Sequence, residues 1–144
     1  DGYRKLQDKY KIVDISQEFK VVSDKFGYGG TVDGIYELTD SHGERKIYIG
    51  DHKTGRLTEK AAMQLSALKY AIKELSGGEL DPGMVAFHTP KNDPAKAVFY
   101  YDPLFWFEGF LGCFQNWKIN NDQYWQLKKK NWAWLEHRPY TVAV

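Results

Sequence analysis

The sequence lacks several features that mark specialised classes of protein. It contains one cysteine, Cys113, which excludes an internal disulfide and favours a reducing, cytoplasmic setting. Cys113 itself, between phenylalanines, is expected at a packed apolar position. No stretch approaches the roughly 20 apolar residues that span a bilayer, and no apolar run follows the first basic residues. We therefore expect neither a membrane anchor nor a secretion signal.

The sequence also lacks an excess of one charge, and its histidines and cysteine are not spaced in pairs as metal ligands are. The 20 Lys and Arg residues balance 19 Asp and Glu residues, so any nucleic-acid interface must be local. The four histidines show no paired spacing, and one cysteine cannot complete a structural zinc site with them. The run Lys128-Lys129-Lys130 is interpreted as a solvated helix face, with a phosphate-contacting patch as the alternative.

What is present indicates one folded domain. The 144 residues are enough for a single core, and 42% hydrophobic with 27% charged residues is typical of globular proteins. Alternation and β-branched residues predict strands, and apolar spacings of three and four predict helices. The expected strands are 17–23, 31–39, 45–54, 84–88 and 97–101, and the expected helices are 58–75 and 103–118. This order predicts an α/β fold, a central mixed β-sheet flanked by helices.

The most informative stretch is Gly30-Thr31-Val32-Asp33, followed by Asp51-His52-Lys53 at the end of the apolar run 47–50. Side chains alternate along a strand, so Asp51 and Lys53 point to one face and His52 to the other. Two carboxylates beside one lysine suit Mg²⁺, which takes one or two carboxylates and completes its shell with waters and phosphate oxygens. A phosphodiester is then the natural substrate. The alternative is a salt bridge from Lys53 to Asp51 or Asp33.

One ordered set of motifs resembles the core signature of the PD-(D/E)XK nuclease superfamily. The set consists of GTVD, an apolar strand, DHKTG and a helix that carries Gln64. The similarity is greatest to its RecB-type and phage exonuclease branch and covers about residues 18 to 75. The resemblance implies a restriction-endonuclease-like core and a Mg²⁺- or Mn²⁺-dependent deoxyribonuclease that acts on DNA. It also favours an exonuclease over an endonuclease.

The resemblance implies a role for each residue that matches the motif. Asp33 and Asp51 would bind the metal, His52 would contribute its backbone carbonyl, and Lys53 would assist catalysis. Glu18 is the best match to a glutamate that many members place before the first aspartate. Gln64 matches the glutamine on the helix, where it would complete the set of catalytic positions.

Two departures from the family are visible. The RecB-type branch often has a tyrosine four residues after the glutamine, but this position is Leu68 here, and Tyr70 lies about 240° from Gln64 around the helix. Members also normally have a helix before the first strand, and few residues precede Gln17. Two interpretations stay open: an abbreviated single nuclease-like domain over 1–144 without that helix, or a fragment of a longer protein.

A second class of function stays open beside the nuclease. The near-zero net charge and the aromatic-rich C-terminal half are compatible with a non-catalytic module on the same fold, binding nucleic acid or another protein. Affinity for Mn²⁺ would discriminate the two, because a structural salt bridge binds no cation. The sequence leaves the oligomeric state open.

Overall fold

The structure is a computed structural model, and it describes residues 2–121. The chain divides into two compact units, residues 1–110 and residues 111–144. The Lys128–Lys130 run lies outside the described residues. Within residues 2–121, no helix has both the length and the apolar character needed to cross a bilayer.

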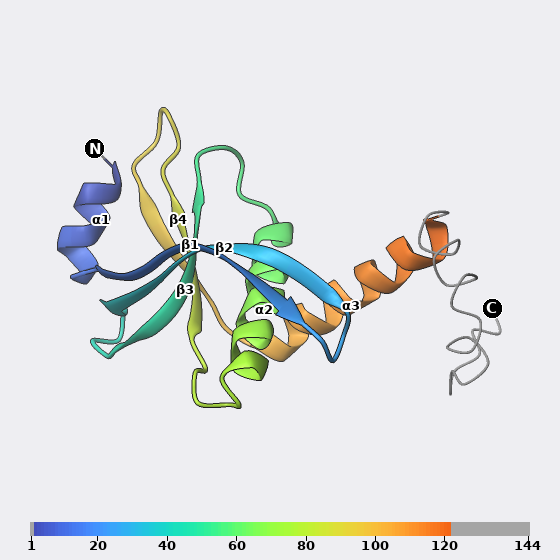
Figure 1. The fold of residues 1–144 in the computed structure, drawn as a ribbon. Helices are drawn as coiled ribbons and strands as arrows, with labels where there is room; N and C mark the ends of the chain where they lie inside the picture. The colour runs from blue at the N-terminus through green and yellow to red at the C-terminus, as the bar shows by residue number, and fades with distance from the viewer. Residues whose placement is uncertain (1, 122–144) are drawn as a thin grey trace, which may run out of the picture. The chain divides into compact units, whose positions relative to one another are not determined.

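The prediction of an α/β fold with a central mixed sheet is confirmed (Figure 1). Five strands lie in the order β1-β2-β3-β4-β5 and three helices accompany them. The elements are α1 (Gly2–Tyr10), β1 (Val13–Ser23), β2 (Tyr28–Thr39), β3 (Arg45–Lys53), α2 (Glu59–Leu75), β4 (Gly83–His88), β5 (Lys96–Tyr100) and α3 (Pro103–Asn120).

Only one neighbouring pair of strands is parallel. β1 with β2, β2 with β3, and β4 with β5 are antiparallel, whereas β3 and β4 run parallel and are joined through α2. β2 and β3 are joined by a hairpin turn, in which the Asp40 carboxylate accepts hydrogen bonds from the N–H groups of His42 and Glu44. A crossover helix is the usual way to join parallel neighbours, which explains why α2 covers the sheet.

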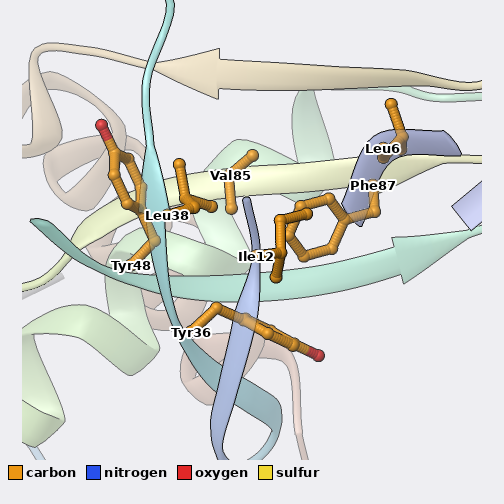
Figure 2. Packing of buried hydrophobic residues seen from close by; sticks show 7 residues of the cluster. All are labelled: Leu6, Ile12, Tyr36, Leu38, Tyr48, Val85 and Phe87. Carbon is orange, nitrogen blue, oxygen red and sulfur yellow. The ribbon is translucent and has the colours of Figure 1, made fainter. Parts of the chain in front are cut away.

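The two faces of the sheet are covered by different helices, α1 on one and α2 on the other (Figure 1). On the α1 side a cluster of buried side chains fills the space (Figure 2). Its members are Leu6, Ile12, Tyr36, Leu38, Tyr48, Val85 and Phe87. On the other side, α2 contacts β1 to β4 and buries Leu65 and Ile72. The site residues described below therefore sit on a sheet supported from both sides.

The helix α1 corrects the expectation that the chain lacks a helix before its first strand. Tyr3, Leu6 and Tyr10 are three and four residues apart, so they share one face, and Leu6 is buried against the sheet. The other positions are polar, and a helix this short gains its stability from packing. Sequence periodicity alone is therefore a weak signal for it.

The expectation of a packed Cys113 is wrong, because Cys113 is exposed. It lies six residues after Phe107, the buried aromatic residue of α3, and at 3.6 residues per turn it points about 120° away from it. An apolar sequence neighbourhood does not bury every position of a helix, since one stripe alone can face a core.

Candidate active site

The two aspartates singled out by the sequence lie on adjacent antiparallel strands. Gly34 of β2 pairs with Gly50 of β3, so the next residue on each strand brings Asp33 opposite Asp51. Residues opposite one another in a ladder share a face and lie close together. Both line one cavity of about 440 Å³ between β2 and α2.

The alternation predicted for β3 is confirmed by the contacts of its last three residues. Lys53 Nζ lies 3.1 Å from an Asp51 carboxylate oxygen, so these two side chains share a face. The ring of His52 lies on the α1 side, where its Nε2 is 2.8 Å from the Tyr36 hydroxyl and the rings of Tyr3 and Phe87 pack against it. The strand thus has a charged pair on one face and, on the other, the exposed imidazole of His52 in contact with aromatic rings.

Asp33 is held by the backbone of the neighbouring strand. The N–H of His52 donates a hydrogen bond to Asp33 Oδ2 at 3.0 Å. The N–H and C=O of one strand residue point to the same side of the strand, so the His52 carbonyl also lies on the β2 side. The ladder between β2 and β3 ends at Gly34 and Gly50, and this carbonyl therefore faces the space where the two strands separate.

The pKa values of the two carboxylates are shifted in opposite directions. Burial, together with the hydrogen bond to Asp33, raises the pKa of Asp51 to about 6. Burial acts in the same direction on Asp33, but the hydrogen bond from Asp51 and the N–H of His52 outweigh it and lower the pKa of Asp33. Two close carboxylates with pKa values pushed apart share one proton below about pH 6, and that proton is lost at higher pH.

The donor set fits a hard divalent cation of the Mg²⁺ type. Among residues 2–121, no group of three or more His, Cys, Asp and Glu side chains converges as a metal site. Mg²⁺ does not need one, because it keeps several waters and takes one or two carboxylates, with phosphate oxygens completing its shell. Asp33, Asp51 and the carbonyl of His52 would supply the protein ligands. The Asp51 carboxylate, half-buried beside a second acid, is the observation that favours a cation there.

Gln64 lies on the wall of the same cavity, contributed by α2. Leu68, four residues on, lines the cavity beside it, as expected for one helix face. Tyr70 packs on Phe107 with ring centroids 4.4 Å apart and is absent from the lining of this cavity. The geometric argument that Tyr70 cannot replace a tyrosine at the Leu68 position is confirmed.

Glu18 lies next to the pair without lining the cavity. Gln17 pairs with Gly34 and Phe19 with Val32, so the ladder places Glu18 opposite Asp33 on the same face. Its side chain is exposed. Three acidic residues on three neighbouring strands thus lie side by side, with Asp33 in the middle.

Sequence reasoning missed the rest of the cavity wall. Gly29, Gly30 and Thr31 line it from β2, and Tyr28 and Phe110 contribute aromatic rings to its lining. A glycine pair inside a strand was the available signal, since glycine in a strand marks a close approach of another group. A Cβ on Gly30 would lie 2.9 Å from Leu68 on α2, which is too close for any other residue without movement of that side chain.

Neither a comparison with models of protein families nor a comparison with curated proteins finds a match for this chain. A proposal about its function therefore depends on the residues and geometry described above.

Proposed function

We propose that this protein is a Mg²⁺-dependent deoxyribonuclease of the PD-(D/E)XK type that hydrolyses DNA phosphodiester bonds. The observation that carries the proposal is the pairing of Asp33 and Asp51 on one wall of a cavity, with Lys53 beside them. Asp51 is half-buried beside Asp33, an exposed acid, and a second negative charge next to a half-buried carboxylate is costly unless a cation balances the two. A phosphodiester supplies the oxygens that complete the shell of such a cation.

Each residue has a role that follows from its position. Asp33, Asp51 and the His52 carbonyl would hold the metal, which when bound polarises a phosphoryl oxygen and lowers the pKa of its water. Lys53 is oriented by Asp51 and would donate to the developing negative charge of the phosphoryl group. Gln64 would position the phosphate or the attacking water from α2. An exonuclease, acting from DNA ends, follows from the family resemblance.

A non-catalytic module on the same fold is the second candidate. Large apolar side chains at the start of α3 favour it, because Leu104 and Phe105 are 57% and 66% exposed. Such side chains can form a binding surface for another protein. In this case Asp51 and Lys53 would form a structural ion pair without affinity for a divalent cation.

The test is digestion of linear and closed circular DNA in Mg²⁺ by the same preparation. We expect the protein to degrade the linear DNA and to leave the closed circle intact. EDTA should abolish the degradation. Asp33→Asn and Asp51→Asn should abolish the activity while Glu37→Gln, a change of an exposed acid on the same strand as Asp33, should keep it. Cleavage that persists in EDTA, or in Asp51→Asn, would contradict the metal-dependent mechanism.

A further inference from the structure

The segment that follows Lys53 is a loop with few attachments. Residues 54–57 lead from β3 to α2 and contain neither helix nor strand (Figure 1). In the described part of the chain, one hydrogen bond ties this segment to the rest of the protein, between Nε2 of His88 and the carbonyl of Gly55 at 2.7 Å. Because Lys53 directly precedes the loop, the placement of its side chain depends on how firmly the loop is held.

His88 is the last residue of β4 and lies beside Lys53. The parallel ladder pairs these two residues, so both side chains lie on the sheet face that carries Asp51. The next residue extends the contact, because the N–H of Thr89 donates a hydrogen bond to the carbonyl of Lys53 at 2.9 Å. Two consecutive residues at the end of β4 thus hold the carbonyls on either side of Thr54.

The hydrogen bond to Gly55 fixes the tautomer of the His88 ring. A carbonyl oxygen can only accept, so Nε2 carries a proton. The other ring nitrogen, Nδ1, is buried and has no hydrogen-bond partner within the residues that the structure describes. A buried nitrogen without a partner destabilises a fold, so a histidine is a poor choice here for packing alone. The contribution of this ring is the bond from Nε2 to the loop.

We propose that His88 is a positioning residue for Lys53, acting through the carbonyl of Gly55. The inference rests on the proposed function, in which Lys53 donates to the reacting phosphate. Lys53 Nζ lies 3.1 Å from an oxygen of Asp51, but the lysine side chain is 36% exposed, so packing alone does not hold it. An attachment two residues further along restricts its main chain. Displacing a donor by about 1 Å can lower a rate about a hundredfold.

Two substitutions of His88 separate its hydrogen bond from its packing. His88→Phe keeps a ring, removes the unpartnered Nδ1 and loses the donor at Nε2. We expect this variant to be at least as stable to urea as the unsubstituted protein, with kcat lowered about tenfold and KM for DNA unchanged. His88→Gln places an amide nitrogen near the position of Nε2 and should retain kcat within about threefold. A residue with a structural role alone would leave kcat per folded molecule unchanged in both variants.

A double-mutant cycle tests whether His88 acts through Lys53. In the Lys53→Ala background, His88→Phe should have no further effect on kcat, because the group that it positions is gone. A tenfold loss that persists in that background would overturn the proposal. Affinity for Mn²⁺ should be the same in His88→Phe as in the unsubstituted protein. His42→Ala removes a histidine side chain from the turn at the opposite end of β3 and should change none of these quantities.

The side chain of Lys53 can also be observed without cleavage. In the metal-free protein, the NMR signals of its ε-methylene group, identified with Lys53→Ala, report the pairing with Asp51. We expect these signals to be unchanged in His88→Gln and to move toward those of an exposed lysine in His88→Phe. Unchanged signals in His88→Phe, or an unchanged kcat, would overturn the positioning role.

The positioning role and the nuclease function can fail separately. A shift of the Lys53 signals in His88→Phe, in a protein that cleaves no DNA, would contradict the nuclease and support the link from His88 to Lys53. Mg²⁺-dependent cleavage that His88→Phe leaves unchanged would overturn the positioning role and support the nuclease.

Discussion

The hydroxyl of Tyr36 lies 2.8 Å from Nε2 of His52, on the face of the sheet opposite the two aspartates. Desolvation beside the aromatic rings lowers the pKa of His52, which favours the neutral ring that shares a hydrogen bond with this hydroxyl. The same residue donates its backbone N–H to Asp33. His52 therefore serves the site through its main chain, while its ring, although exposed, contacts the aromatic rings on the opposite face of the sheet.

This division predicts the phenotype of His52→Ala. The substitution keeps the N–H and C=O that face Asp33 but empties the space between Tyr3, Tyr36 and Phe87. Because His52 is exposed, we expect a loss of only about 1 kcal/mol in the free energy of unfolding, with the cleavage rate per folded molecule largely retained. Urea denaturation and a rate assay on the folded fraction measure the two effects. A folded, metal-binding but inactive His52→Ala protein would show that the imidazole takes part in the chemistry.

Lys53→Ala should have the opposite phenotype. Lys53 is partly exposed and paired with Asp51, so its removal disturbs little packing. Loss of one donor aimed at the reacting phosphate should slow cleavage on the order of a hundredfold or more. Lys96→Ala, on the exposed start of β5, is the matched control for the charge. Equal effects of the two substitutions would indicate a general electrostatic contribution to DNA binding.

The acid pair predicts a pH-dependent stability in the absence of metal. The pKa of Asp51 rises from an ordinary value of 3.8 to about 6 on folding, so the folded state binds this proton more tightly. That stabilisation is complete below about 3.8 and is lost as the pH rises through 6. Between pH 4 and pH 7 in EDTA, Asp51→Asn should therefore gain stability relative to the unsubstituted protein, on the order of 2 kcal/mol. Denaturation curves across this pH range measure the difference in unfolding free energy between the two proteins. A difference that stayed constant with pH would refute the interpretation.

A second ion pair lies away from the site and serves as a structural contrast. The Lys69 ammonium is buried, pairs with Asp81 and lies 2.7 Å from the carbonyl of Pro82. Asp81→Ala leaves that charge with a single acceptor and should cost about 1–3 kcal/mol of stability. The rate of cleavage per folded molecule should not change, because Lys69 and Asp81 line a different cavity from the one that Asp33 lines. A variant with full stability and a reduced rate would contradict this assignment.

The fold could be predicted largely because its strong signals are local. Helix α2 combines apolar residues at helical spacing with an acid in its first turn, and the Asp40 turn has the residues that hairpins prefer. Thr58 lies at the N-cap of α2, although its side chain makes no capping hydrogen bond there. Helix α1 escaped prediction because a short, mostly polar helix depends on the core it covers.

The same limit applies to the candidate site. Strand alternation predicted that Asp51 and Lys53 share a face, since that relation lies within one strand. The cavity wall at Phe110 could not be predicted, because it brings α3 residues to β2 and α2, far apart in the chain. The place of Glu18 opposite Asp33 likewise depends on the register of β1, which contains an irregularity between Asp14 and Ser16.

Titration of the metal-free protein with Mn²⁺, followed by calorimetry, tests most directly whether Asp33 and Asp51 form a cation site. We predict one saturable site in the unsubstituted protein, loss of that binding in Asp33→Asn and in Asp51→Asn, and its retention in Glu37→Gln. The absence of Mn²⁺ binding, or binding that survives both asparagine substitutions, would contradict the account and leave Asp51 and Lys53 as a structural ion pair.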